Sequence, residues 1–407
     1  MLALTGNESR LKVSEFKLST LLEITNAINN NLPEEQLFVL FQYILEHQLN
    51  IGKAVVFLNQ EGTWESVLHF GVSDDELNIN IERDLKGIRD ITVMEMMGIK
   101  SKSFDVVIPV FHQSKIIAYL MLGDIDEQEM RASPIIRHLP FIQTLANLTA
   151  VAVENKRLVR ESLKQERVKR ELEMASEMQG LLLPNELPNN ENLQVAAFYR
   201  PHQEVGGDFY DVIRISEEEY IFCMADVSGK GISAAILMAS FQANLRANAQ
   251  VGKNLEDIAQ DLNKQVWNNA QGERFITMFL ARYNTRSRKM HYVNAAHPSP
   301  LLLNEGSSID LTQGCVGLGM FDELPFVNSG KEQVASNSLF ICYTDGLDEL
   351  ENDRGDVFDR DSLKNAVESF SYKDMFELNE KIMLALNNHR GRLDFHDDIA
   401  LISCRFF

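Results

Sequence analysis

Residues 205–239 constrain the fold most strongly, because they place two aspartates beside glycines at either end of a short apolar segment. Asp208 follows a pair of glycines, and Asp226 comes eighteen residues later, before a Ser-Gly-Lys-Gly turn. The segment YIFCMA between them is typical of a buried strand. A carboxylate at the end of such a strand is held rigidly, which suits a hard divalent cation. The alternative interpretation is that each aspartate only forms a turn with its glycines.

Two more apolar segments downstream carry aspartates at their ends. Asp345 follows SLFICY and precedes a glycine, and Asp397 and Asp398 lead into the apolar run 400–404. Four carboxylates that converge from different strand ends would hold two divalent ions about 3.5–4 Å apart. Two such ions lower the pKa of a water and clamp a phosphoryl oxygen, which is the chemistry of phosphate-ester hydrolysis. The all-oxygen ligand set favours Mg²⁺ or Mn²⁺ over Zn²⁺ or Cu²⁺.

Length and charge limit the other possibilities. A chain of 407 residues is expected to form two or three domains of about 100–200 residues each. The net charge of −20 argues against general nucleic-acid binding, because phosphate repels an acidic surface. We interpret the charge instead as a solvated surface together with an acidic metal site.

The four cysteines predict neither a zinc site nor a disulfide framework, because no two of them have CxxC spacing. We expect buried free thiols in a reducing compartment. Residues 1–4 and those that follow show no signal-peptide pattern. Apolar runs such as 116–122 are too short to cross a bilayer, so the expected location is cytoplasmic.

The N-terminal residues 1–140 predict an α+β domain with an antiparallel sheet. Helical periodicity runs through residues 14–50, and strand-like segments follow at 53–58, 65–70, 105–111 and 116–122. This order of elements, with the strand sequences VVIPV (106–110) and IIAYL (116–120), resembles a GAF domain. The resemblance implies a sensor of a small molecule or another signal. The alternative is a structural dimerisation domain without a ligand.

Residues 141–183 predict one near-continuous helix, because no glycine or proline interrupts the stretch before Gly180. Two sets of residues fit heptad spacing, with a phase shift between them: Leu145, Leu148, Ala152, Asn155 and Val159, then Val168, Leu172, Ala175, Gln179 and Leu182. Asn155 at a core position would set the register. Heptads of this kind predict a parallel coiled-coil dimer, and the phase shift makes the helix a candidate switch. The alternative is a long helix packed on its own domain.

Residues 184–407 resemble the metal-dependent protein phosphatases of the PPM superfamily, and more narrowly the bacterial SpoIIE-type branch. The segment LLLP at 181–184 also fits that branch. The resemblance rests on motifs in a fixed order: GGDFYD (206–211), DVSGKG (226–231), AAILMA (234–239), FITM (275–278), NAAHP (294–298), GLG (317–319), YTDGLDE (343–349) and DDI (397–399).

The resemblance implies an αββα sandwich and a role for each aspartate. Asp226 would bridge two Mn²⁺ or Mg²⁺ ions, and the carbonyl group of Val227 would bind the second. Asp345 and Asp397 would hold the first ion, and Asp208 would act on the second, partly through water. Asp208 and Asp226 are therefore the predicted catalytic residues.

Four further residues are predicted to support the metal ligands or to contact the substrate. Gly207 would allow close backbone approach. Asp211 and Asp398 would hold the ligands in place, and the alternative is that they are turn or cap residues. Lys230 would neutralise the phosphate, unless it is a solvated turn lysine.

Some positions depart from the family pattern or stay ambiguous. The family usually has Gly where this chain has Ala296 and Thr where it has Ala400, neither of which is a ligand position. His297 is a candidate general acid or a residue that stabilises the turn. The sequence shows no clear arginine clamp for the phosphate, and Arg200 is a weak candidate.

Taken together, these residues predict a serine/threonine phosphoprotein phosphatase that an N-terminal sensor regulates through a dimeric helix. The resemblance implies that its substrate is a STAS-type anti-sigma-factor antagonist. Two alternatives remain: a phosphatase fold that serves as a signalling scaffold, and a phosphatase of a small phosphate ester.

Overall fold

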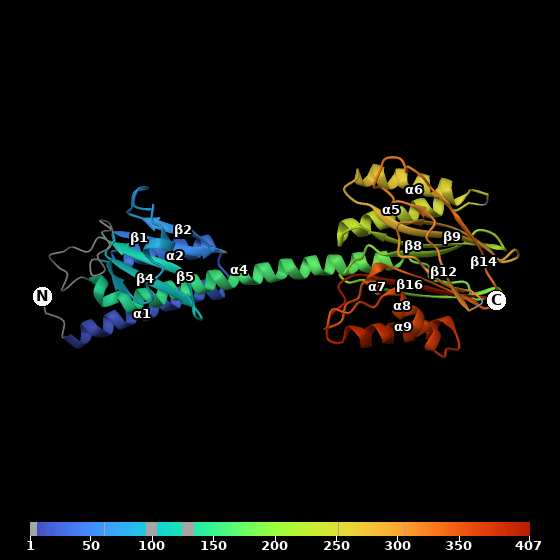
Figure 1. Ribbon diagram of the computed structural model, residues 1–407. Coiled ribbons are helices and arrows are strands. Elements are labelled where there is room, and N and C mark those ends of the chain that lie inside the picture. Colours follow the sequence, from blue (N-terminus) through green and yellow to red (C-terminus); the bar gives the residue numbers. More distant parts are fainter. Residues whose placement is uncertain (1–5, 61, 95–103, 124–133, 251, 305) are drawn as a thin grey trace. The chain divides into compact units, whose positions relative to one another are not determined.

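The computed structural model describes residues 6–60, 62–94, 104–123, 134–250, 252–304 and 306–407 (Figure 1). The first residues of the segment that shows no signal-peptide pattern, residues 1–4, lie outside this part of the chain. The chain divides into two compact units, Met1–Glu166 and Arg167–Phe407. The three-part division at residues 140 and 183 stays a prediction.

The N-terminal unit contains the antiparallel sheet that the sequence predicts. Its strands pair in the order β2-β1-β5-β4-β3, and every pairing is antiparallel. The strands are β1 (Lys53–Gln60), β2 (Thr63–Phe70), β3 (Thr92–Val93), β4 (Val106–His112) and β5 (Lys115–Gly123). The turn between β4 and β5 is tight, since Gln113 adopts a positive φ of 56°.

Helices pack on both faces of this sheet. One face is covered by α1 (Gly6–Asn29), α2 (Glu34–Tyr43), a π-helical turn (Ile44–Gln48) and the first half of α4. The other face packs against α3 (Ile81–Asp84) and its neighbours, where the buried Tyr119 hydroxyl donates a 2.8 Å hydrogen bond to the Leu85 carbonyl. The described part of this unit is thus an α+β module with two apolar cores.

The long helix α4 spans Pro134–Gly180, so the predicted start near residue 141 is wrong. Pro140 lies inside the helix, where it removes one backbone hydrogen bond. The helix continues through it because Leu139, Phe141 and Ile142 are buried on the sheet. At the other end, residues 181–183 form a turn, so the helix also stops earlier than predicted.

The heptad positions of α4 differ in burial. Leu145 and Ala152 are buried in the core of the N-terminal unit, as in the alternative interpretation of a helix packed on its own domain. Asn155, Val159 and Val168 are exposed. The coiled-coil dimer stays a prediction.

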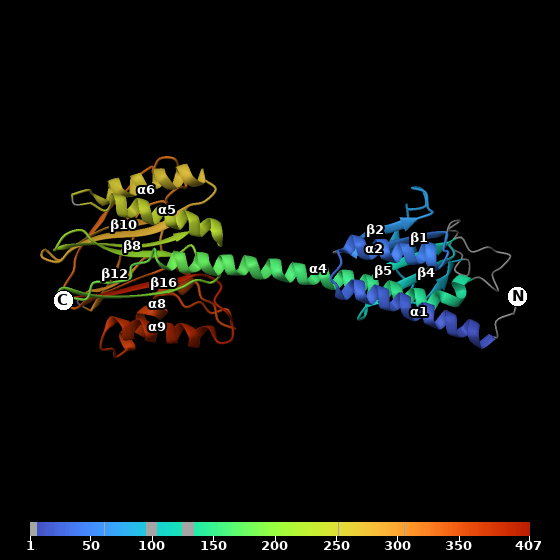
Figure 2. The same cartoon turned by 180° about the vertical axis from the view of Figure 1, so that it is seen from behind.

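The C-terminal unit consists of two sheets with helices outside them (Figures 1 and 2). The first sheet has the order β13-β10-β9-β8-β7, with β14 also on β10, and the second has the order β12-β11-β15-β16-β6. All pairings are antiparallel except the short parallel pairing of β10 with β13. The strands are β6 (Leu193–Arg200), β7 (Phe209–Arg214), β8 (Glu219–Val227), β9 (Ile276–Asn284), β10 (Lys289–Ala295), β11 (Leu301–Asn304), β12 (Ser307–Asp310), β13 (Gly314–Cys315), β14 (Gly330–Gln333), β15 (Ser338–Tyr343) and β16 (Ile399–Phe406).

The helices complete the αββα layering that the resemblance implies. The outer face of the first sheet is covered by α5 (Ile232–Asn248) and α6 (Leu255–Ala270), and that of the second by α8 (Arg360–Ser369) and α9 (Met375–Arg390). A short helix, α7 (Asp345–Asp348), follows β15. Aromatic contacts among Phe222, Phe340 and Phe406 link the inner faces of the two sheets.

Two further observations concern the cysteines and the helices. All four cysteines are buried and free, as predicted. Of the helices in the described ranges, none combines the length and apolarity needed to cross a bilayer.

Candidate active site

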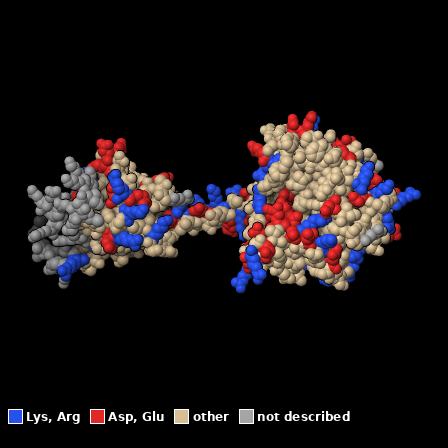
Figure 3. Space-filling view, in the orientation of Figure 1, with Lys and Arg blue, Asp and Glu red and all other residues tan. Residues whose placement is uncertain are grey.

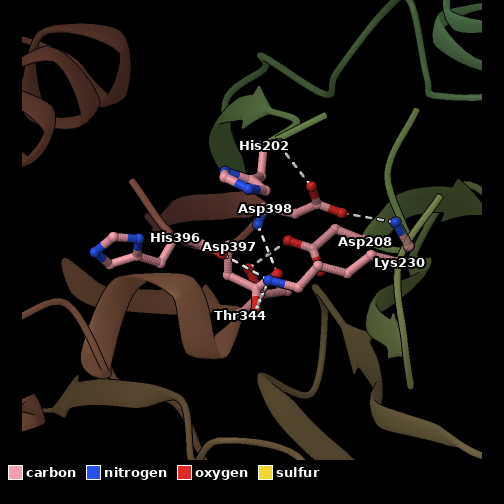
Figure 4. Close-up of polar contacts among 8 residues, drawn as sticks. His202, Asp208, Lys230, Thr344, His396, Asp397 and Asp398 are labelled. Carbon is pink, nitrogen blue, oxygen red and sulfur yellow. Dashed lines mark hydrogen bonds and ion pairs between the residues drawn. The ribbon is translucent and has the colours of Figure 1, made fainter. Parts of the chain in front are cut away.

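The strand ends of the two sheets bring the predicted aspartates together. Asp208 directly precedes β7, and Phe209 pairs with Ala225 of β8, so Asp208 lies beside Asp226 at the edge of the first sheet. In the second sheet, Asp345 follows β15 and Asp397 precedes β16, and these two strands are neighbours. Acidic side chains gather on this face of the C-terminal unit (Figure 3), and Figure 4 shows the side chains of three aspartates at close range.

The negative charges of this cluster repel one another. Asp208 is 1% exposed, and burial raises its pKa well above the usual range, with further contributions from the charges of Asp226 and Asp398. Burial, followed by the charge of Asp345, raises the pKa of Asp226 to about 7. The hydroxyl group of Thr344 donates a 2.6 Å hydrogen bond to Asp208 Oδ2. Carboxylates crowded in this way need cations to stay ionised together.

Lys230 supplies one positive charge to the cluster. Its Nζ atom lies 2.8 Å from Asp397 Oδ2 and donates a 2.6 Å hydrogen bond to the His396 carbonyl (Figure 4). The side chains of Lys230 and Asp397 are 42% and 41% exposed, so water screens this pair. Lys230 is therefore an ion-pair partner of a predicted metal ligand rather than a freely solvated turn lysine.

Asp398 holds the glycine loop that leads to Asp208. Its Oδ1 accepts the N–H of His202 at 2.7 Å, and its Oδ2 accepts the N–H of Gly207 at 2.6 Å (Figure 4). A Cβ atom at Gly206 would lie 2.4 Å from this carboxylate, and one at Gly207 would lie 2.9 Å from the Val227 carbonyl oxygen. Both positions therefore need glycine for the loop to approach the Asp398 carboxylate and Val227.

Asp211 has a different partner from the other predicted site residues. Its carboxylate is buried and accepts two hydrogen bonds from Arg246 of α5, at 2.8 and 3.1 Å. Side chains alternate along a strand, so Asp211 on β7 faces the helix layer. The structure thus places Asp211 in an ion pair between sheet and helix, outside the aspartate cluster.

His297 lies in a tight turn beside Thr277, which pairs with Asp226 across β8 and β9. The backbone N–H of His297 donates to Asn294 Oδ1 at 2.8 Å, and its ring Nδ1 lies 2.9 Å from Thr277 Oγ1. Burial lowers the pKa of the imidazole to about 3. This geometry favours the turn-stabilising interpretation over the general acid. Ala296 supplies the positive φ of the turn, 53°, where the family usually has glycine.

Three residues near the site were missed by the sequence analysis or assigned to another role. Thr344 precedes Asp345, and its place before a helix was an available signal for an oriented hydroxyl. Gln179 was assigned to a heptad position, yet its amide group hydrogen-bonds the backbone of Gly206. The guanidinium of Arg274 donates to the Ser228 carbonyl at 2.5 Å, and no local pattern indicated this.

The donor set fits a pair of hard divalent cations. It combines four carboxylates with the Val227 carbonyl group, which are the ligands that Mg²⁺ and Mn²⁺ prefer. Among the described residues, the buried Tyr199 hydroxyl has no hydrogen-bond partner, and it interacts with the charges of Asp398 and Asp208. It would therefore be available to bond a water bound to a metal ion. Within the described ranges, no three acidic, histidine or cysteine side chains already surround a common point. Two interactions stabilise the site in this form. Lys230 forms an ion pair with Asp397, and Thr344 donates a hydrogen bond to Asp208.

Comparisons with known proteins find similarity over most of this unit. The family described as Stage II sporulation protein E (SpoIIE) matches residues 216–407. Phosphoserine phosphatase RsbU of Bacillus subtilis (strain 168) is 26% identical over 243 residues, which cover 59% of this chain and 71% of RsbU. Phosphoserine phosphatase RsbP of the same organism is 26% identical over 239 residues, which cover 58% of this chain and 57% of RsbP.

A solved structure supports the fold. The SiaA-PP2C domain of Pseudomonas aeruginosa is 21% identical and superposes with a TM-score of 0.53, covering 60% of this chain and 99% of that domain.

Proposed function

We propose that the C-terminal unit is a SpoIIE-type serine/threonine phosphatase domain and that it uses two divalent metal ions to hydrolyse phosphoserine or phosphothreonine on a protein. The observation that carries this proposal is the convergence of four aspartates from two sheets. Burial and mutual repulsion raise the pKa values of three of them, Asp208, Asp226 and Asp345.

Five groups of this chain would hold the metal ions. Asp226 would bridge them, with the Val227 carbonyl and Asp208 on one side and Asp345 and Asp397 on the other. When bound, Mn²⁺ or Mg²⁺ supplies an activated water and a positive charge for the phosphoryl oxygens. Thr344 fixes the orientation of Asp208 through its 2.6 Å hydrogen bond.

Lys230 and Asp398 would position the loops around the reacting phosphate. Lys230 lies 2.8 Å from Asp397, so its ammonium group would supply positive charge beside a phosphate bound at this ligand. Asp398 holds the loop before Asp208 through its hydrogen bonds to the N–H groups of His202 and Gly207. Positioning of this kind lets groups outside the ligand set influence the reaction rate.

We further propose a STAS-type anti-sigma-factor antagonist as the substrate. The support is the motif order that the chain shares with the SpoIIE-type branch and the similarity to two proteins named phosphoserine phosphatase. A small phosphate ester stays the second candidate, and a preference for a free ester over a phosphoprotein would favour it.

The N-terminal unit and α4 are proposed to regulate this activity. The N-terminal unit would be a GAF-type sensor, with or without a small-molecule ligand, and the support is the order of elements in its sequence together with its antiparallel sheet. The last turn of α4 contacts the segment before Asp208 through Gln179, which gives the helix a physical route to the site. A homodimer through the exposed half of α4 is part of the same proposal.

Hydrolysis of p-nitrophenyl phosphate tests the proposed reaction. We expect the intact chain to require Mn²⁺ or Mg²⁺, and Asp226→Asn to lower kcat by at least about a thousandfold, because one ligand that bridges both ions is lost. Asp361→Asn, at an exposed position of α8, is the matched control and should retain full activity. Equal activity of Asp226→Asn and the intact chain would refute the two-metal site. A comparison of the intact chain with residues 167–407 alone would show whether the N-terminal unit raises or lowers the phosphatase activity.

A further inference from the structure

Two arginines stack on the same phenylalanine beside the aspartate cluster. The guanidinium carbon of Arg200, at the end of β6, lies 4.7 Å from the ring centroid of Phe395. That of Arg390, at the end of α9, lies 4.6 Å from the same centroid. The ring is 6% exposed and is anchored in the core between the second sheet and its helices. The two positive charges are therefore held near each other on a rigid support.

Neither guanidinium has a carboxylate partner in the described part of the chain. Arg390 donates from Nε to Asn387 Oδ1 at 3.0 Å and from Nη1 to the Leu393 carbonyl, and both acceptors are neutral. Arg200 is exposed, and its guanidinium group has no hydrogen bond or ion pair among the described residues. In a chain with 59 acidic residues and a net charge of −20, two adjacent arginines without an acidic partner are an available anion-binding group.

The backbone places this pair next to the predicted metal ligands. Arg200 pairs with Ile399 in the β6–β16 ladder, and Ile399 directly follows Asp398. Phe395 lies two residues before Asp397. Because side chains alternate along β6, Tyr199 faces the inside of the sandwich and Arg200 faces the α9 side. The arginines thus lie beside the aspartate cluster and not within it. From there they would contact a substrate side chain that neighbours the phosphorylated residue, and not the reacting phosphate itself.

We propose that Arg200 and Arg390, stacked on Phe395, bind an anionic side chain of the phosphoprotein substrate close to its phosphorylated residue. A carboxylate or a second phosphate has the required charge and the oxygen geometry that a guanidinium binds. This inference rests on the proposed phosphatase function and adds a preference for substrates with an acidic group near the phosphoserine.

Two phosphoserine peptides that differ only in flanking Glu or Gln residues test the preference in the intact chain with Mn²⁺. We expect kcat/KM to be higher for the Glu peptide by about fivefold, as two partly exposed ion pairs would give. Arg200→Gln and Arg390→Gln should each bring the ratio of kcat/KM for the Glu peptide to kcat/KM for the Gln peptide closer to one. Arg200→Lys should retain part of the preference for the Glu peptide. Hydrolysis of p-nitrophenyl phosphate should change by less than about twofold, since that substrate has no flanking acid. Arg392→Gln, a neighbouring exposed arginine, is the matched control.

A second readout does not depend on catalysis. Fluorescently labelled copies of both peptides are titrated with the metal-free intact chain, and the Glu peptide should bind more tightly in a manner that requires Arg200 and Arg390. If this binding difference appears without hydrolysis of any substrate, the anion site stands and the proposed phosphatase function fails.

Three results would overturn the anion site. The first is that the intact chain has the same kcat/KM for the two peptides. The second is a preference that survives Arg200→Gln and Arg390→Gln. The third is that both variants lose inhibition by inorganic phosphate while their peptide preference is unchanged, which would assign the arginines to free phosphate instead.

Discussion

The side-chain amide of Gln179 forms two hydrogen bonds with the backbone of Gly206. Its Nε2 donates to the Gly206 carbonyl at 2.7 Å, and its Oε1 accepts the Gly206 N–H at 3.1 Å. Gln179 is 6% exposed and lies in the last turn of α4, while Gly206 lies in the loop between β6 and β7, two residues before Asp208. The end of the long helix therefore fixes the position of a segment that carries a predicted metal ligand.

Removing this amide should weaken metal binding. Gln179→Ala loses both hydrogen bonds and leaves the Gly206 N–H and carbonyl groups unpaired, at a cost of roughly 1–3 kcal/mol. We expect the Mn²⁺ concentration for half-maximal hydrolysis of p-nitrophenyl phosphate to rise by about tenfold. Met178→Ala, at the preceding and 70% exposed position, is the control. An unchanged Mn²⁺ titration for Gln179→Ala would show that the helix end does not stabilise the loop.

A methyl group at Gly206 should disrupt the site. The added Cβ atom would lie 2.3 Å from the Tyr199 hydroxyl and 2.4 Å from Asp398 Oδ2, so one of these groups must move. We expect Gly206→Ala to reduce kcat/KM by at least about a hundredfold, because misplacing a positioning loop by about 1 Å has an effect of this size. At Gly180, a Cβ atom would meet nothing within 4 Å. Gly180→Ala should therefore keep its activity, and similar losses in both variants would contradict the packing argument.

The metal-free protein should become more stable when Asp226 loses its charge. Burial raises the pKa of Asp226 from 3.8 to about 7, so this carboxyl group binds its proton more tightly in the folded than in the unfolded state. Its contribution therefore lowers the free energy of unfolding as the pH rises from about 4 to about 7, after which the loss is complete. In EDTA at pH 8, Asp226→Asn should melt several degrees higher than the parent protein. A lower Tm for the variant would contradict the charge repulsion.

The ion pair beneath α5 should contribute to stability rather than to chemistry. Arg246→Met leaves the fully buried Asp211 carboxylate without its partner, which we expect to cost about 2–4 kcal/mol of unfolding free energy. The double variant Asp211→Asn with Arg246→Met should recover part of this loss. Arg286→Met removes an exposed pair with Glu218 at 3.8 Å and should cost less than about 0.5 kcal/mol. Chemical denaturation measures all three, and equal costs for the two arginine variants would refute the role of burial.

Insertions in α4 should test its helical register. One full heptad inserted at residue 165 keeps the phase of the two heptad sets, whereas three inserted residues rotate one set against the other. If the helix transmits a signal through its register, only the three-residue insertion should change phosphatase activity strongly. Equal activities of the two insertion variants would rule out register-dependent coupling.

Local sequence patterns were sufficient to predict most of the elements and the aspartates at their ends. The apolar segments YIFCMA and SLFICY form β8 and β15, and each is followed closely by its aspartate. These predictions hold because strand periodicity and glycine turns act over a few neighbouring residues. The start of α4 was predicted wrongly because it depends on tertiary contacts. Pro140 suggests the beginning of a helix, but the residues around it pack on the sheet, and this packing outweighs one lost hydrogen bond.

The partners of each polar side chain were decided by tertiary packing alone. Asp211 and Asp398 are both aspartates near glycines or strand starts, yet one binds Arg246 and the other binds the backbone of His202, 196 residues away. The same holds for Gln179 on Gly206 and for two arginines on Phe395. The order of residues along the chain thus determined the strands, the helices and the chemical type of the site. The stacking of one sheet on the other decided which side chains meet there, because these contacts join residues that no local period relates.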